Sequence, residues 1–268
     1  MRIERITSLN DQGQVFSLED VDLIWNSALL GLPSYTAKFA VNSILNTLPT
    51  GEKVKLWNAQ KNSKMSGLCK ICGQSQTLAH ILAECSISGQ KLNTDDPHNT
   101  VTWRHNEILN LVINSVKDHL PQNWKLIVDL KNHPLHYGDQ IPSQYLKTSS
   151  TYRPDIILIT NDQKTIIAEL TSPMDTNMEY WNKEKTRKYE NGLIPHLKSS
   201  AGMYAFKVGA RGVIPRSFFN FLQLFHLSAK QRVKIAKEVS MMALECSRKI
   251  FMNRNTKGWT PVSSLSQA

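Results

Sequence analysis

The sequence predicts an α/β fold, in which a small mixed β-sheet is flanked by helices and preceded by a helical and cysteine-rich segment. Two observations predict it: a hairpin of β-branched runs near the middle of the chain, and helical runs that alternate with strand-like runs on either side of that hairpin. At 268 residues and 41% hydrophobic residues, the chain can bury a full core as one large domain or two small ones.

The first hundred residues are predicted to hold two helices, a cysteine-rich segment and a loop. Ser17 is a suitable N-cap for a helical run that starts near residue 18 and breaks at Leu32-Pro33-Ser34. A second helical run is expected to end near residue 48, at a Leu-Pro-Thr-Gly sequence. The polar stretch over residues 89–100 is predicted to be a loop.

The rest of the chain alternates helices and strands. Residues 103–120 are predicted to form a helix that stops at Pro121, and residues 126–128 to form a strand. Two β-branched runs, separated by Asn161-Asp162-Gln163, predict the hairpin. The later elements are predicted to be a charged helix over 177–189, a strand over 204–208, and helices over 216–227 and 229–252, with Ser228 as the cap of the last.

Asp155 and Glu169 lie at equal distances from the turn of this hairpin. They are therefore expected to be directly opposed on one face, with Cβ atoms roughly 5 Å apart. Two such carboxylates repel each other unless a proton or a cation lies between them. We interpret the pair as a Mg²⁺ site, because one or two carboxylates hold Mg²⁺ in sites that cleave phosphodiesters. The alternative is a hairpin with two solvated acids.

Three of the four cysteines fall within residues 69–85, where Cys69, Cys72, His80 and Cys85 have the spacing of a zinc site. Three thiolates and one imidazole complete a tetrahedral Zn²⁺ site with no open position, so we expect structural rather than catalytic zinc. Contact with nucleic acid is a second role for such a knuckle. Cys246 is interpreted as a small buried hydrophobic residue.

The net charge of +10 lies entirely in the C-terminal part of the chain. Residues 171–268 contain 16 Lys and Arg against 6 Asp and Glu, whereas residues 1–170 contain 16 of each kind. A basic region of this kind is typical of a protein that binds a polyanion, and we expect nucleic acid rather than a membrane. With no signal peptide or long apolar run, the sequence indicates an intracellular protein.

The charged helix after the hairpin carries further candidates for catalysis. Lys185, Lys188 and Tyr189 share one helical face. A lysine can orient the attacking water or neutralise developing negative charge. In many nucleases with a carboxylate pair this lysine comes two residues after the second acid, but here Thr171 holds that position. The alternative is a solvated charged helix.

The helix before the first strand begins with Trp103-Arg104-His105-Asn106-Glu107. Glu107 is a candidate third oxygen ligand of Mg²⁺, and Arg104 and His105 are candidates for contact with phosphate. A capping or packing role for His105 stays open. The full set of candidate nucleic-acid-binding residues is Arg104, His105, Arg153, Arg187 and Arg211.

The order of these motifs resembles the C-terminal part of non-LTR retrotransposon polyproteins that carry a restriction-like endonuclease. The likeness extends over residues 37–212, about two thirds of the chain. The motifs that carry it are the Cys-Cys-His-Cys cluster, Arg-His-Asn, Arg-Pro-Asp, the second acid and a helix reading Lys-x-x-Lys-Tyr.

The resemblance implies a PD-(D/E)XK nuclease fold, with Asp155 and Glu169 on Mg²⁺, Lys185 as the catalytic lysine, and Lys188 and Tyr189 in support. Family members nick one strand at the insertion site, and the freed 3′ hydroxyl primes reverse transcription. Their zinc ligands correspond to Cys69, Cys72, His80 and Cys85. The implied organisation is a helical lead-in (1–68), a zinc segment with a loop (69–100), an endonuclease core (101–227) and a C-terminal helix with a polar tail (228–268).

The chain departs from the family in lacking the aromatic-x-Asp-Asp motif of a polymerase. We therefore expect a fragment, a truncated copy or a domesticated remnant, acting in the nucleus on DNA or on element RNA, with a separately encoded reverse transcriptase as a partner. The alternative function is a catalytically inactive, zinc-containing module that binds nucleic acid.

Overall fold

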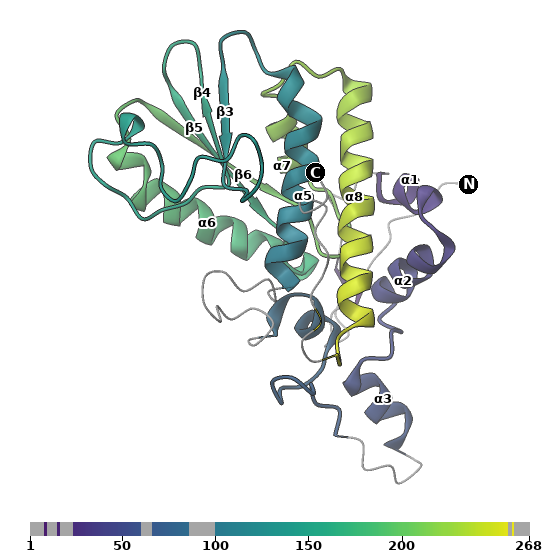
Figure 1. Cartoon of the computed structure of the whole chain (residues 1–268). Helices are drawn as coiled ribbons and strands as arrows, with labels where there is room; N and C mark the ends of the chain where they lie inside the picture. The colour runs from purple at the N-terminus through teal and green to yellow at the C-terminus, as the bar shows by residue number, and fades with distance from the viewer. Residues whose placement is uncertain are drawn as a thin grey trace.

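A computed structural model describes residues 8–9, 15–16, 24–59, 66–85, 100–256 and 259 (Figure 1). The predicted cap Ser17, most of the loop predicted over 89–100 and most of the polar tail lie outside these residues. Among the described helices, none has the length and apolar character needed to cross a membrane.

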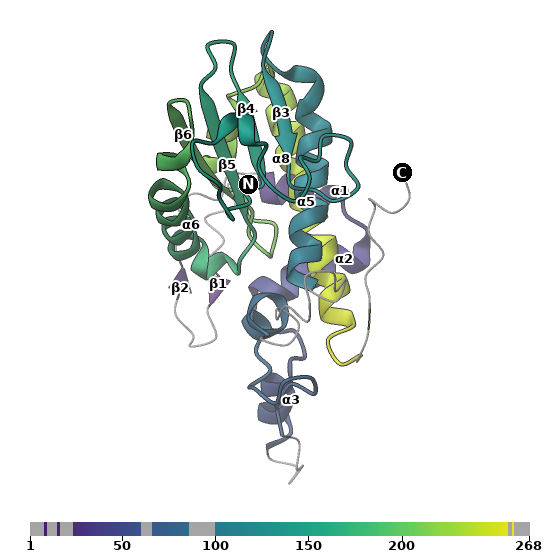
Figure 2. The ribbon, with the colours of Figure 1, turned by 60° about the vertical axis from the view of Figure 1, so that its left-hand side comes forward.

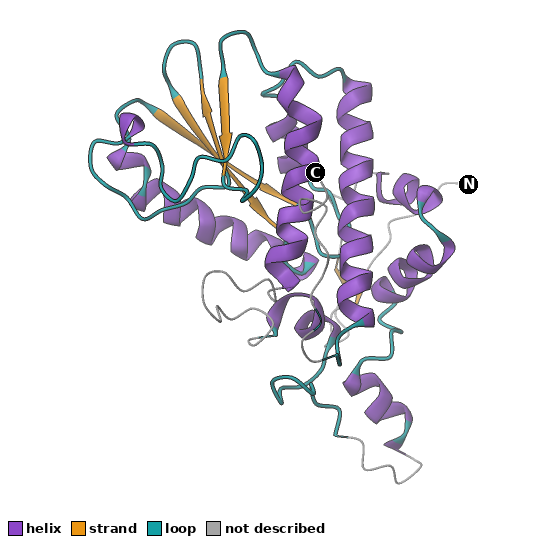
Figure 3. Ribbon diagram, viewed as in Figure 1, coloured by secondary structure: helices purple, strands orange, loops and turns teal. Residues whose placement is uncertain are grey.

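The centre of the fold is a mixed four-stranded sheet, as predicted (Figure 3). Its strands are β3 (Lys125–Val128), β4 (Ile156–Ile159), β5 (Thr165–Thr171) and β6 (Ala201–Lys207). They lie in the order β3-β4-β5-β6, with antiparallel pairing up to β5 and parallel pairing between β5 and β6. A separate pair of two-residue strands, β1 (Ser8–Leu9) and β2 (Val15–Phe16), is antiparallel.

Helices cover both faces of the sheet, and the two faces bury alternate residues of each strand. One face packs against α5 (Thr100–Val116), α7 (Arg216–Leu222) and α8 (Ala229–Met252), and the long helices α5 and α8 lie side by side (Figures 1 and 2). The other face packs against α6 (Met178–Gly192). In β4, Ile156 and Leu158 point to the first face, and Ile157 and Ile159 to the second.

The N-terminal part consists of α1 (Ile24–Gly31), α2 (Ser34–Ile44) and α3 (Gly51–Trp57), of which α1 and α2 lie against α8. The helix α3 was not predicted. α2 ends at Ile44, before the Leu-Pro-Thr-Gly sequence where the helix was expected to end. Thr50 in that sequence begins a new helix, because its side chain accepts a hydrogen bond from the backbone N–H of Lys53.

The other predicted boundaries hold to within a few residues. Ser228 caps α8 through a capping box with Gln231, as predicted. The helix predicted to reach residue 120 ends at Val116 and continues as a 3₁₀ turn, Lys117–His119. α7 ends at Leu222 rather than near 227, and β6 begins at Ala201 because the start of β5 offers it a parallel partner.

Candidate active site and metal centre

Asp155 and Glu169 face each other across β4 and β5, as the hairpin symmetry predicts. Ile156 pairs with Ala168, so the next pair outward is Asp155 with Glu169. Because Glu169 is two residues beyond Ile167, both acids point to the face that α6 covers. Asp155 is 9% exposed and Glu169 is 3% exposed. The reading of two solvated acids is therefore wrong.

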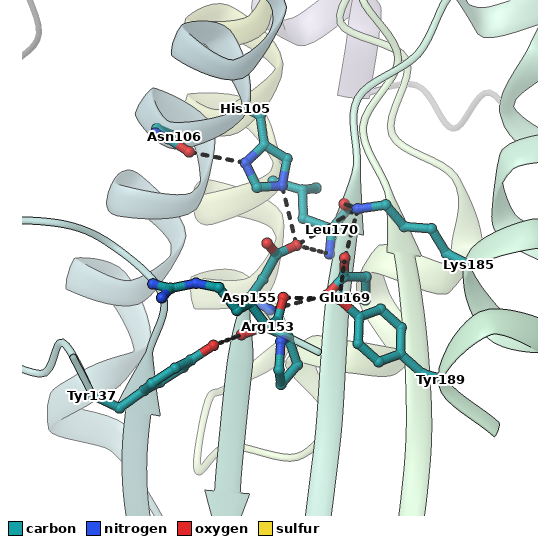
Figure 4. Close-up of polar contacts among 10 residues, drawn as sticks. His105, Asn106, Tyr137, Arg153, Asp155, Glu169, Leu170, Lys185 and Tyr189 are labelled. Atoms are coloured by element: carbon teal, nitrogen blue, oxygen red, sulfur yellow. Dashed lines mark hydrogen bonds and ion pairs between the residues drawn. The ribbon is translucent and has the colours of Figure 1, made fainter. Parts of the chain in front are cut away.

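Backbone groups of the facing strands fix both carboxylates (Figure 4). The N–H of Asp155 donates to Oε2 of Glu169 at 2.9 Å, and the N–H of Leu170 donates to Oδ2 of Asp155 at 2.8 Å. Within the described part of the chain, Oδ1 of Asp155 has no hydrogen-bond partner. One oxygen of this acid is therefore available to a ligand.

Lys185 reaches the acid pair from α6. Its Nζ lies 2.7 Å from Oε1 of Glu169, 2.7 Å from the carbonyl oxygen of Leu170 and 3.9 Å from Oδ2 of Asp155. We call these three oxygens the oxygen cage. The structure thus brings Lys185 to the site from the helix, while Thr171 leaves its own hydroxyl buried without a partner among the described residues.

The charges of the site are strongly coupled. Burial and the charge of Asp155 raise the pKa of Glu169 to about 7, against the opposing effect of Lys185. Burial alone would raise the pKa of Asp155, but His105 and Lys185 outweigh it and lower that pKa. Burial opposes the charge of Lys185, yet the two carboxylates raise its pKa. The site therefore keeps Asp155 ionised, whereas Glu169 holds its proton up to about pH 7 even with Lys185 beside it.

His105 belongs to this cluster. Its Nε2 lies 3.1 Å from Oδ2 of Asp155, and its Nδ1 lies 3.1 Å from Oδ1 of Asn106. Both ring nitrogens face oxygens, which favours the doubly protonated imidazolium. Burial would lower the pKa of His105, but the Asp155 carboxylate raises it overall. His105, which was predicted to contact phosphate, is thus bound to the carboxylate of Asp155.

Tyr189 and Lys188 occupy different layers of the site. The Tyr189 hydroxyl donates to the carbonyl oxygen of Arg153 at 2.8 Å and lies 3.3 Å from Oε1 of Glu169. Burial and the nearby acids raise the pKa of Tyr189, so its phenol stays neutral. Lys188 lies outside the acid pair, with Nζ 4.9 Å from the centre of the Tyr189 ring and 5.7 Å from that of Tyr152.

The predicted phosphate contacts of Arg104 and Arg211 are wrong, because both side chains are buried. Arg104 donates to the carbonyl oxygens of Leu82 and Ser172 and to two serine hydroxyls. Arg211 forms an ion pair with Asp175 at 2.5 Å. Both arginines join segments of the fold and cannot reach a phosphate.

Glu107, the predicted third oxygen ligand, does not join the acid pair. It is buried on α5, near Cys246 of α8. Burial raises the pKa of the Cys246 thiol most, and the nearby charge of Glu107 raises it further. Glu107 is two positions after His105, about 200° around the helix, so only one of them can face Asp155. Cys246 itself is buried, as predicted.

The two remaining candidate arginines stay partly exposed. Arg153 clamps the chain before β4 by donating from Nε to Oδ2 of Asp129 at 2.9 Å. Arg187 is 69% exposed and pairs with Glu184 at 2.8 Å. Either guanidinium retains exposed surface that can contact a phosphate.

Tyr137 is a residue near the site that the sequence did not predict. Its hydroxyl donates to the carbonyl oxygen of Pro154, directly before Asp155. A backbone partner of that kind leaves no signal in residue types.

The predicted zinc ligands form one group that can hold a metal ion. The ligand atoms of Cys69, Cys72, His80 and Cys85 all lie within 4.8 Å of one another. Gly73, at φ 76°, provides the turn after Cys72, and His80 begins a short π-helix, His80–Glu84, that presents it with Cys85. Burial lowers the pKa of His80 and so favours the neutral imidazole that a metal binds.

A scan against models of protein families finds no match, and a search of curated proteins finds no similar sequence. The geometry of the chain itself therefore has to carry any functional conclusion.

Proposed function

We propose that this chain is a Mg²⁺-dependent endonuclease that nicks DNA and that derives from a non-LTR retrotransposon polyprotein. The observation that carries the proposal is the position of the Lys185 ammonium, inside an oxygen cage made by Asp155, Glu169 and Leu170. The start of β4, the end of β5 and α6 supply a carboxylate pair, a backbone carbonyl and a lysine close together, and each of these parts serves metal-dependent phosphodiester cleavage.

The donor set fits Mg²⁺. This ion prefers oxygen ligands and is usually held by one or two carboxylates with water completing its shell. The oxygen cage offers one carboxylate oxygen each from Asp155 and Glu169, and the Leu170 carbonyl as the third oxygen. The raised pKa of Glu169 supports the fit, because a carboxylate that ionises only near pH 7 gains most from a bound cation.

When bound, Mg²⁺ would polarise the phosphodiester and lower the pKa of an attacking water. The protein groups would do the rest. Lys185 would turn from the cage towards the phosphate and neutralise the charge that develops there. His105 would hold Asp155 ionised and oriented, and Tyr189 would fix Glu169 from the opposite side.

The metal group of Cys69, Cys72, His80 and Cys85 is proposed to be a structural zinc site. Four protein ligands leave no position for a substrate, so its contribution would be to folding. Arg104 supports this role, because it joins Leu82, between the last two ligands, to Ser172, three residues beyond Glu169. The same arginine would transmit zinc binding to the acid pair.

Nuclear DNA is the proposed substrate, with element RNA and a separately encoded reverse transcriptase as further partners. The support is the excess of positive charge in residues 171–268, together with the motif order that resembles the retrotransposon endonucleases. Phosphate neutralisation by lysine and arginine gives affinity for either nucleic acid.

Nicking of supercoiled plasmid, with Mg²⁺ added or omitted, tests the proposal. We expect Mg²⁺-dependent nicking by the wild type, and loss of at least about 10²-fold in Asp155→Ala and Glu169→Ala. Asp162→Ala is the matched control, because Asp162 lies exposed in the turn of the same hairpin. Equal nicking by the wild type and both active-site variants would contradict the assignment.

The second candidate function is a zinc-containing module that binds nucleic acid without cutting it. It is favoured by one observation: Lys185 already neutralises the acid pair, as a structural ion pair would. In that case plasmid nicking would be absent, salt-sensitive DNA binding would remain, and Mg²⁺ would not change the unfolding temperature.

A further inference from the structure

A groove with aromatic walls opens beside the acid pair. Its volume is about 660 Å³, within the usual range for small-molecule sites of roughly 300–1,000 Å³. One wall is α6 from Trp181 to Gly192 and the other is Tyr152, in the segment before β4. The lining residues are Tyr152, Trp181, Glu184, Lys185, Arg187, Lys188, Asn191 and Gly192.

Two aromatic rings give this groove flat apolar surface. Trp181 is 47% exposed, although a tryptophan usually buries more of its ring. Tyr152 is half-buried, with its ring centre 6.0 Å from that of Tyr189. Gly192 lets Tyr152 pack closely against α6, because a Cβ at this position would collide with the tyrosine ring. The ring of Tyr152 is therefore seated on the end of α6.

The charge of the groove is positive. Lys185, Arg187 and Lys188 line it, against the single acid Glu184. Lys185 pairs with Glu169 and Arg187 with Glu184, so among the described lining residues Lys188 is the cation that faces the groove without an acid partner. Lys188 lies over the rings of Tyr152 and Tyr189, a cation–π arrangement that keeps the ammonium at the groove surface. Flat apolar rings with cations between them match a polymer that has flat bases and a phosphate for each base.

Lys185 connects the groove with the acid pair. It lines the groove and also lies 2.7 Å from Glu169 and 3.9 Å from Asp155. A nucleotide bound in the groove would therefore place its phosphate next to the carboxylates. The bases of a duplex are stacked and paired, so their faces cannot reach Trp181 or Tyr152; an unpaired base can.

We propose that the groove binds an unpaired nucleotide of a single-stranded segment that adjoins the phosphodiester to be cut. The cleavage of an adjoining phosphodiester rests on the proposed nuclease function, but binding of the nucleotide in the groove can be measured without cleavage. Single-stranded DNA and single-stranded RNA share the chemistry that the groove recognises, and separate arms of the test distinguish them.

The test measures binding of a fluorescein-labelled, 12-nucleotide oligo-dT (a length of roughly one binding site) with Ca²⁺ in place of Mg²⁺. Parallel arms use oligo-U of the same length and an oligo-dT duplex with oligo-dA. We expect the wild type to bind single strands more tightly than the duplex. Trp181→Ala and Lys188→Gln should each weaken single-strand binding by about 5- to 10-fold.

Matched controls come from the same protein. Trp57→Ala removes a tryptophan of similar exposure, 53%, on α3, and Lys183→Gln removes an exposed lysine of α6 that does not line the groove. Both should bind single strands like the wild type. Unchanged binding in Trp181→Ala and Lys188→Gln, equal weakening in the two controls, or tighter binding of the duplex by the wild type would overturn the proposal.

The outcome is independent of whether the chain cuts DNA. Absence of nicking, together with Trp181-dependent binding of single strands, would reject the nuclease and retain the groove. Nicking that depends on Asp155, together with single-strand binding indifferent to Trp181, would reject the groove and retain the nuclease. Tighter binding of oligo-U than of oligo-dT would make RNA the occupant, and the reverse order DNA.

Discussion

The ammonium of Lys185 lies 2.7 Å from Oε1 of Glu169, whereas many nucleases with a carboxylate pair carry a lysine two residues after the second acid, the position that Thr171 holds here. The side chain comes instead from α6, which covers the face of the sheet to which both acids point. The lysine and the carboxylates meet because the fold stacks α6 on β5.

Replacement of Lys185 should remove the proposed nicking activity, and a lysine at position 171 should restore part of it. We expect Lys185→Ala to lower plasmid nicking by about 10²- to 10³-fold, since one group that stabilises developing charge is worth that much. Thr171→Lys in the Lys185→Ala background should recover at least about 10-fold, because residues 169 and 171 share a face of β5. Lys183→Ala, on the exposed side of α6, is the control and should nick like the wild type.

Recovery fails if the buried position of Thr171 cannot hold a longer chain, so folding is checked by thermal unfolding. A folded double variant without any recovery would show that the site of action of Lys185 cannot be reached from β5.

Zinc removal should unfold the segment around the four ligands and then reduce nicking. We expect one zinc ion per chain by atomic absorption, and a lower unfolding temperature in Cys72→Ser, because structural zinc contributes directly to folding. Cys246→Ser serves as the control, since this cysteine lies outside the metal group of the described residues and should leave zinc content at one ion. Full zinc content in Cys72→Ser would contradict the ligand assignment.

Arg104→Met should lower the free energy of unfolding strongly, whereas replacement of the exposed Arg187 should leave it almost unchanged. Loss of the buried guanidinium leaves the carbonyl oxygens of Leu82 and Ser172 without their donor, which costs about 2–4 kcal/mol of unfolding free energy. Arg187→Met, on the exposed surface of α6, should change it by less than about 0.5 kcal/mol. Urea unfolding measures both, and equal effects would contradict the structural role of Arg104.

The stability of the metal-free acid site should fall as the pH rises. Glu169 has its pKa raised to about 7 in the fold from an ordinary 4.5, so the stability from its bound proton is complete below 4.5 and is lost as the pH passes 7. Without Mg²⁺, the unfolding temperature of the wild type should therefore drop more between pH 5 and pH 8 than that of Glu169→Gln, by about 3 °C or more.

Glu190→Gln, an exposed acid of α6, is the matched control and should keep the pH slope of the wild type. Addition of Mg²⁺ at pH 8 should raise the unfolding temperature of the wild type but not that of Glu169→Gln. An identical pH slope in the wild type and Glu169→Gln would show that Glu169 does not titrate in this range.

Local signals predicted much of the secondary structure. The symmetry of the hairpin about Asp162 gave the pairing of Asp155 with Glu169, because antiparallel register depends only on distance from the turn. Ser228 and its partner Gln231 marked the start of α8. The helix α3 escaped prediction because Pro49 and Gly51 suit a loop as well as a helix start.

The roles of the arginines could not be predicted from residue type. A guanidinium binds phosphate and backbone carbonyls with the same donors, so only burial separates Arg104 and Arg211 from the exposed Arg187. Glu107 and His105 likewise differ in the direction in which each leaves α5, which depends on how that helix is rotated against the sheet.

The sequence by itself determined the α/β class, the metal group of Cys69, Cys72, His80 and Cys85, and the opposition of Asp155 and Glu169. All three depend on short-range periodicity, spacing or turn symmetry. Only the tertiary structure decided that Lys185 enters the oxygen cage, that His105 holds Asp155, and that Trp181 and Tyr152 line a groove beside them. These relationships join α5, α6 and the sheet, and their geometry follows from the packing of apolar faces rather than from any local pattern.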